Sequence, residues 1–278
     1  MDRPRAWRRR QSHRGFRSPV AALLVALVCL GAVTAGVWLG KSVYDALLVG
    51  RPRETGGGQA VETWSVLPPG AELWWVQVGA FLDLARARTV EASLEKLGYP
   101  VYVSSRGPSP VLHRVRAGVF ATKGRATALE RELKAAGFED VYLSALPMNA
   151  HPVTIAAGDP AYLEELAGGL ELLGGFLADQ AGWWGTVGSW ELDRAAAQAA
   201  LASLAAPIRQ FQSLLAAGSA PATGAEIHQQ ATVLAGLAVG NLSELEAYAE
   251  KGERARMRGA MVEFMRLVDA YDSFWSSE

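Results

Sequence analysis

The amino-acid sequence predicts an α+β protein in which a small βαββαβ domain lies between an N-terminal transmembrane helix and a C-terminal all-α helical bundle. Three observations predict this organisation: an internal repeat in the middle of the chain, a long uncharged apolar run near its start, and apolar residues at helical spacing towards its end. The repeat is the most specific of the three, because residues 76–99 align with residues 115–138 without a gap. The duplicated domain is expected to span residues 72–146.

The strands of each copy are indicated by the alternation of side chains. Residues 73–78 and 112–117 follow a period of two, which is typical of a strand with one apolar and one mixed face. Short strands are expected over residues 99–105 and 141–146, where each copy ends. Each copy therefore contributes two strands.

A helix is expected between the two strands of each copy. Asp83 and Thr122 are suited to the N-cap, because a short side-chain oxygen accepts hydrogen bonds from the free amides of the first turn. Apolar residues follow both caps at helical spacing and form a single stripe. Gly98 and Gly137 stand where helices favour a left-handed residue after their last turn. The predicted order of the domain is thus βαββαβ.

Alternation also divides the sheet into two chemically different faces. The valines of the strands are expected to face the core, and these residues the other side: Trp75, Gln77, Tyr102, Ser104, Arg114, Arg116, Tyr142 and Ser144. An aromatic ring covers the C–H side of a sugar, and amide and guanidinium groups bond its oxygens, so this face is suited to a glycan. The alternative interpretation is an ordinary solvated face on which Trp75 is covered by the linker or by the C-terminal domain.

Residues 76–81, Val-Gln-Val-Gly-Ala-Phe, and residues 113–120, His-Arg-Val-Arg-Ala-Gly-Val-Phe, resemble the sporulation-related repeat (SPOR) family, whose domain recognises septal peptidoglycan. The resemblance implies a ferredoxin-like fold, with a four-stranded antiparallel sheet, two helices on one face and the glycan strand across the other. Gln77 matches a site position of the family, and Arg114 matches another. Ala80 and Leu112 replace the hydroxyl and the aromatic residue that are typical there. Together, the residues and the resemblance predict these glycan-binding residues: Trp75, Gln77, Ala80, Tyr102, Leu112, Arg114, Arg116 and Tyr142.

The N-terminal segment is predicted to anchor the protein in the cytoplasmic membrane. Residues 1–18 form a basic tail, and Val20–Leu39 is an uncharged run about 30 Å long as a helix, which is enough to span a bilayer. The transmembrane helix is assigned to residues 19–40, with the basic tail in the cytoplasm and the rest of the chain outside. The alternative is a cleaved signal peptide that ends near Val33-Thr34-Ala35.

The C-terminal half of the chain is predicted to be helical. Residues 41–71 and 147–157 are rich in helix and strand breakers, so they are expected to be linkers on either side of the duplicated domain. Residues 158–278 keep an apolar spacing of three and four, which predicts four helices joined by short connections in an antiparallel bundle. Thr223 and Glu226 form a capping box for the third of these helices.

The composition argues against several classes of function. A net charge of −1 is not that of a general polyanion binder, and the single Cys29 lies in the apolar run, where it forms no disulfide within the chain. The four histidines are scattered and no catalytic motif is present, so no metal, cofactor or catalytic residue is predicted. RNA-recognition domains share the βαββαβ order, but the export topology and the lack of their basic-aromatic strand motif argue against nucleic acid.

These observations predict a non-catalytic protein of the cell membrane that binds peptidoglycan glycan strands outside the cytoplasm, including strands that lack stem peptides. Binding would place it at the division or sporulation septum, and its layout is similar to that of septum proteins. A protein partner is expected to bind the C-terminal helical domain. The alternative is a cell-wall hydrolase or regulator whose helical domain is catalytic or recruits a wall enzyme.

Overall fold

The computed structural model describes residues 62–66, 72–107, 109–148, 153–157, 160–187, 194–218 and 224–276. One of the two compact units of the chain spans Gln59–Glu278 and contains all of them. The predicted basic tail and the predicted transmembrane segment Val20–Leu39 lie outside the described residues. Among the residues that are described, no helix is both long and apolar enough to cross a membrane.

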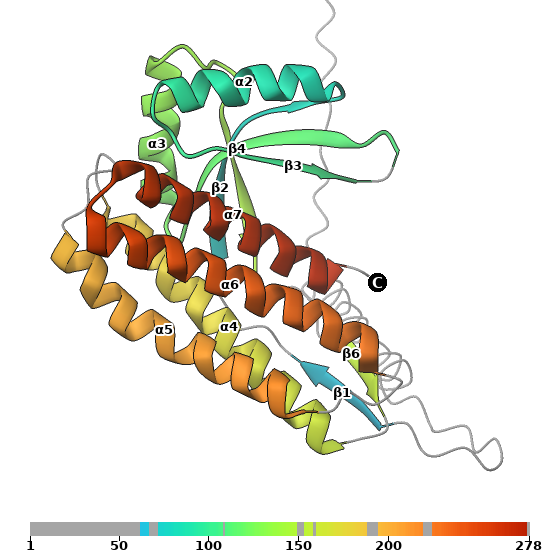
Figure 1. Ribbon diagram of the computed structural model, residues 1–278. Helices are drawn as coiled ribbons and strands as arrows, with labels where there is room; N and C mark the ends of the chain where they lie inside the picture. The colour runs from blue at the N-terminus through green and yellow to red at the C-terminus, as the bar shows by residue number, and fades with distance from the viewer. Residues whose placement is uncertain are drawn as a thin grey trace, which may run out of the picture. The chain divides into compact units, whose positions relative to one another are not determined.

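The duplicated region folds as one antiparallel sheet with two helices (Figure 1). The strands lie in the order β3-β4-β2-β5, and their bounds are β2 Glu72–Phe81, β3 Tyr102–Arg106, β4 Leu112–Phe120 and β5 Tyr142–Pro147. Helix α2, Leu84–Lys96, follows β2, and helix α3, Lys123–Ala135, follows β4. The predicted βαββαβ order and the four-stranded antiparallel sheet are confirmed.

The predicted ends of both helices are also found. The Asp83 side chain accepts a hydrogen bond from the Ala85 amide at 2.8 Å, and Thr122 Oγ1 accepts one from the Arg125 amide. After the helices, Gly98 has a φ of 89° and Gly137 a φ of 97°. Only glycine adopts these values without strain, so both copies stop their helix in the same way.

A β-bulge at Gln77 shapes the centre of the sheet. The register between β2 and β4 shifts on both sides of this residue. Gly79, just after the bulge, lies under the ring of Phe81, because a Cβ atom on it would come within 2.6 Å of that ring. Gly118 lies under Phe120 in the same way, with a closest approach of 2.9 Å. The repeated Gly-x-Phe pattern is thus a packing unit, and the bulge allows residues an odd number apart to share a face.

The helix-facing side of the sheet forms an aliphatic core. Helices α2 and α3 both contact β2 and β4. The fully buried residues here include Val76, Leu94, Val115, Leu129 and Leu133, each with 0 % of its surface exposed. Burial of such side chains is the main stabilising contribution in a domain of this size.

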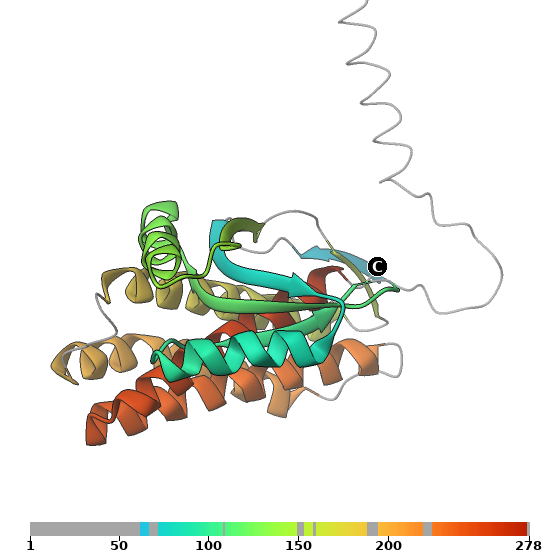
Figure 2. The same cartoon turned by 90° about the horizontal axis from the view of Figure 1, so that it is seen from above.

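Four long helices form the C-terminal region, as predicted. They are α4 Pro160–Thr186, α5 Arg194–Ala217, α6 Ala225–Lys251 and α7 Arg254–Ser276. Each contacts the next along the chain, and Figure 2 shows them running side by side. Gly169 allows α4 and α5 to approach closely, since a Cβ atom there would lie 2.5 Å from the ring of Phe211. The N-cap of α6 is Gly224, one residue after the predicted Thr223, and it makes no side-chain cap bond.

Two strands lie within segments that were expected to be linkers only. Strand β1, Glu62–Val66, pairs antiparallel with β6, Val153–Ala157, in a separate two-stranded sheet. Both strands contact α4. Their sequences, Glu-Thr-Trp-Ser-Val and Val-Thr-Ile-Ala-Ala, contain the β-branched residues that strands favour. Each strand has only five residues and lies among helix and strand breakers. Its partner is distant in the sequence, so the local pattern did not predict it.

Candidate functional site

One row of side chains crosses the whole sheet, one from each strand. Tyr102 of β3 is paired with Arg116 of β4, Arg116 with Gln77 of β2, and Gln77 with Tyr142 of β5. Directly paired residues of neighbouring strands point to the same side. The structure therefore brings four of the predicted glycan-binding residues into one line on a single face.

Further predicted residues form shorter rows on that face. Ala80 is paired with Arg114, and Arg114 with Ser104, while Leu112 is paired with Arg106. Ala80 is three residues from Gln77, and it reaches the same face because the bulge adds a residue between them. We call this side of the sheet the polar face.

Trp75 and Gln77 are fixed within the polar face by their neighbours. The Arg116 guanidinium lies 4.1 Å from the centroid of the Trp75 ring, a cation–π arrangement, and Trp75 is only 4 % exposed. The Gln77 side-chain amide donates a hydrogen bond to the Tyr142 hydroxyl, and Gln77 is 3 % exposed. The centre of the row is consequently buried, which corrects the expectation of an open face.

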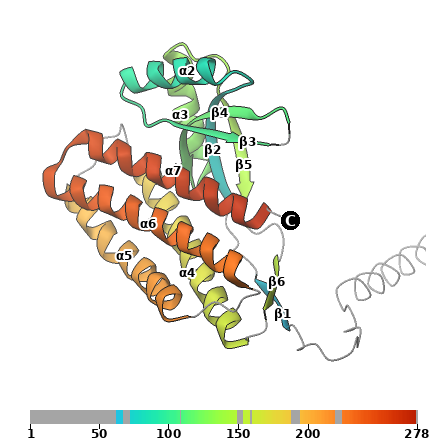
Figure 3. The same cartoon turned by 45° about the vertical axis from the view of Figure 1, so that its right-hand side comes forward.

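Helix α7 lies on the polar face, on the side away from α2 and α3 (Figures 1 and 3). It contacts β3 and β4, while α4 contacts β4. The Ala121 amide at the end of β4 also donates a hydrogen bond of 3.3 Å to the Ala181 carbonyl of α4. The C-terminal helices thus pack against the polar face at β3 and β4, and the buried Trp75 lies on that face beside Arg116.

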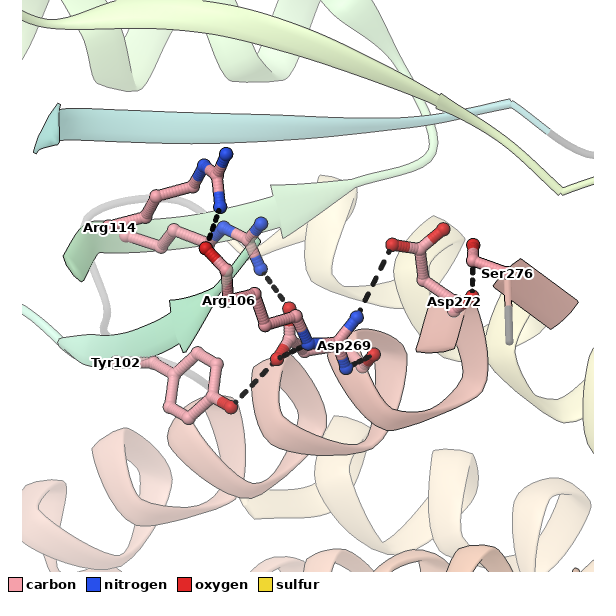
Figure 4. A network of polar contacts seen from close by, with 7 residues as sticks. Tyr102, Arg106, Arg114, Asp269, Asp272 and Ser276 are labelled. Carbon is pink, nitrogen blue, oxygen red and sulfur yellow. Dashed lines mark hydrogen bonds and ion pairs between the residues drawn. The ribbon is translucent and has the colours of Figure 1, made fainter. Parts of the chain in front are cut away.

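Three donors of the polar face converge on one carboxylate of α7 (Figure 4). Asp269 accepts hydrogen bonds from Arg116 Nη1 and, at 3.0 Å, from the Tyr102 hydroxyl. Arg106 Nε lies 3.1 Å from Asp269 Oδ2, the same oxygen that Tyr102 bonds, and Arg106 Nη2 donates to the Asp269 backbone carbonyl. Asp269 is 3 % exposed, so water screens the Coulomb attraction in these pairs less than it does in surface pairs. We call these four residues the Asp269 network.

Burial and charge shift the pKa of one group in this network, Tyr102, and of one group beside it, Asp272. Burial, together with the negative charge of Asp269 and its hydrogen bond, raises the pKa of Tyr102 to about 12, against the opposing effect of Arg106 and Arg116. Burial also raises the pKa of Asp272, although Arg106, at 3.6 Å, acts in the opposite direction. Tyr102 therefore remains a neutral hydrogen-bond donor at physiological pH.

The rim of the polar face stays accessible. Tyr142 is 45 % exposed, and Ala80 is also exposed. Arg114 is half-buried and donates through Nη1 to the Arg106 carbonyl at 3.3 Å, without a carboxylate partner among the described residues. It lines a cavity of about 820 Å³ that Val233 also lines. This cavity opens between the β3–β4 end of the sheet and helices α6 and α7.

The sequence interpretation missed the acidic partner, Asp269. A signal for it exists, because Met257, Met261, Met265 and Asp269 follow one another at intervals of four on α7. The three methionines are buried, so Asp269 places an acidic side chain at the fourth position of an apolar stripe. An acidic residue on such a stripe requires a buried cationic or donor partner.

No group of three or more histidine, cysteine or acidic residues is placed to hold a metal ion in the part of the chain that the structure describes. The polar face offers aromatic rings and hydrogen-bond donors, which are suited to recognition. A pair of carboxylates flanking a bond, as glycoside hydrolysis needs, is not formed by the Asp269 network.

Comparison with known proteins assigns the duplicated region to a family. Residues 70–144 match the SPOR domain family, so this part of the chain is a SPOR domain. A solved structure, the peptidoglycan-binding domain of the cell wall lytic enzyme CwlC from B. subtilis, is similar at 29 % sequence identity. The similarity covers 28 % of this chain and 94 % of that one, with a TM-score of 0.25. The search of curated proteins found no match to this chain.

Proposed function

We propose that the SPOR domain binds glycan strands of peptidoglycan on its polar face. The observation that carries this proposal is the row of Tyr102, Arg116, Gln77 and Tyr142 across all four strands. Neighbouring strands lie about 4.8 Å apart, so the row runs for roughly 14 Å and is suited to an elongated ligand. Rings at its ends would cover sugar C–H faces, and the donors between them would bond sugar oxygens.

Binding alone, without catalysis, is the role we assign to this domain. A glycan held on the polar face would place the protein at a particular region of the cell wall. We further propose that Val20–Leu39 holds the chain in the cytoplasmic membrane and that the bound wall is that of a division or sporulation septum. The sequence supports the first of these by the length and lack of charge of the segment. The SPOR match supports the second.

The test is co-sedimentation of the full-length chain, held in detergent, with purified sacculi before and after an amidase removes their stem peptides. Arg114→Ala removes a rim guanidinium that the Asp269 network does not use. Arg131→Ala is the matched control, because Arg131 is exposed on α3, on the opposite side of the sheet. Loss of a charged hydrogen bond is worth about 1.5–3 kcal/mol, so Arg114→Ala should weaken binding by roughly tenfold or more.

Arg131→Ala should bind like the wild type. Stronger retention on amidase-treated sacculi would identify the bare glycan as the ligand. Equal binding by the wild type and Arg114→Ala would contradict the assignment of the polar face.

A further inference from the structure

The polar face is occupied by the chain itself. Arg116 and the Tyr102 hydroxyl are donors that would bond a glycan's oxygens. Both already donate to Asp269, which lies on the C-terminal helix α7. Because α7 contacts β3 and β4, it lies over half of the row that a glycan would follow. A strand of sugars crossing from β5 to β3 and helix α7 cannot occupy this place together.

We propose that α7 is an intramolecular competitor of the glycan, with Asp269 as its anchoring side chain, so that the structure is the masked form of the SPOR domain. This inference rests on the proposed function and adds its regulation. Glycan binding then requires the sheet and α7 to separate, and separation exposes the full row.

The chemistry of the contact makes it exchangeable. A buried ion pair gains Coulomb energy but loses the hydration of both charges, and these terms nearly cancel. Separation would return Arg106, Arg116 and Asp269 to water, or the two arginines to a ligand. The sheet and its helices α2 and α3 would keep their aliphatic core, because that core lies on the opposite face.

The masked form also leaves hydrogen-bonding capacity unused. Arg116 Nε and Ser104 Oγ are buried on the polar face, and neither has a hydrogen-bond partner among the described residues. Buried donors without partners are costly, so this contact is less favourable than a fully bonded one. A ligand rich in hydroxyl and carbonyl oxygens can satisfy them where a single carboxylate does not.

The cavity beside Arg114 provides a point of first contact. It lies at the edge of the covered area, with a volume of about 820 Å³, and Arg106 and Asp272 line it as well. A glycan end bound by Arg114 would lie next to the Arg106–Asp269 pair, and would compete for Arg106 before reaching the centre of the row. Displacement from this edge needs no simultaneous opening of the whole contact.

The decisive variant is Asp269→Asn in the full-length chain, because it removes the charge and keeps the shape of the side chain. Its matched control is Glu263→Gln on the same helix, whose carboxylate pairs with Arg266 at 2.8 Å within α7. The probe is amidase-treated sacculi. If α7 covers the polar face in most molecules, the apparent affinity for these sacculi is reduced in proportion to the small fraction of molecules that are open. Asp269→Asn should increase that fraction and raise the apparent affinity by roughly tenfold. Glu263→Gln should leave the affinity unchanged.

A second measurement uses the wild type alone. Soluble glycan strands released from amidase-treated sacculi are added, and backbone hydrogen exchange is followed by peptide. Exchange should rise across α7 as it leaves the sheet, while α5, which packs against α4 and α6, serves as the internal reference. This experiment decides the question even if Asp269→Asn fails to fold.

The outcomes separate the two proposals. Equal binding by wild type and Asp269→Asn, with α7 protection unchanged by glycan, overturns masking and leaves the glycan site in place. Binding by neither form, with no response of α7, contradicts the glycan site itself and masking with it. Tighter binding by Asp269→Asn supports both.

Discussion

The two faces of the SPOR sheet are covered by different means. On one face, α2 and α3 bury aliphatic side chains, and each helix directly follows a strand that it covers. On the other, α7 contacts β3 and β4 through charged and hydroxyl groups, although it lies more than a hundred residues later in the chain. The comparison shows that one sheet can combine a permanent core with a cover that is held by directional contacts.

The two kinds of contact respond differently to opening. Apolar burial is non-directional. Separating α2 and α3 from the sheet would expose aliphatic side chains to water, with no other ligand to replace the lost contacts. An ion and hydrogen-bond network can be exchanged for water or for another ligand with the same chemistry. The aliphatic face therefore maintains the fold, and the polar face is free to change partners.

The largest effect on stability is expected on the aliphatic face. Leu133→Ala deletes a fully buried side chain of α3 and should lower the free energy of unfolding by about 2–5 kcal/mol, because it leaves a cavity. Leu97→Ala is the matched control, since Leu97 is 57 % exposed at the end of α2. Urea unfolding followed by circular dichroism measures both. A similar cost for the two variants would show that this face is not the core.

A smaller effect, dependent on pH, is expected on the polar face. The pKa of Tyr102 is raised to about 12 in the folded protein, from 10.0, so its contribution is complete below pH 10 and is lost as the pH rises towards 12. Allowing for solvent screening of this partly exposed group, the loss is about 1 kcal/mol. Tyr102→Phe removes this group and keeps the ring.

The comparison to make is unfolding of wild type and Tyr102→Phe at several values between pH 9 and 12. Tyr99 and Tyr271, whose pKa values are also raised by burial, remain in both proteins and cancel. The wild type should lose more stability over this range. Parallel curves would show that the Tyr102 hydroxyl does not bond Asp269 in solution.

The smallest effect is expected for an ion pair outside both faces. Lys134 and Glu130 pair at 2.7 Å along α3, and the Lys134 side chain is 46 % exposed. Lys134→Ala should change the free energy of unfolding by less than about 0.5 kcal/mol, because water screens such a pair and its side chains lose entropy on pairing. Thermal unfolding at low and high salt would test this, and a loss above 1 kcal/mol at high salt would disprove it.

Much of the SPOR domain could be predicted from local sequence. The helix caps at Asp83 and Thr122, the glycines at 98 and 137 and the strand alternation each depend on a few neighbouring residues, and the structure confirms them. Most residues of the polar face were also predictable, because side chains that are two residues apart on a strand lie on the same side of the sheet. The bulge that adds Ala80 to that face is a departure from simple alternation, and it follows from pairing between strands.

Sequence by itself therefore determined the duplicated fold, its aliphatic core and most residues of the polar face, since these depend on patterns within each repeat. Only the tertiary structure decided what covers that face. In the Asp269 network, Arg116 and Asp269 are 153 positions apart. Strand β1, before the SPOR domain in the sequence, pairs with β6, which follows it. Periodicity records which side of an element is apolar, but it carries no information about which distant element meets that side, because that choice depends on the packing of the complete chain.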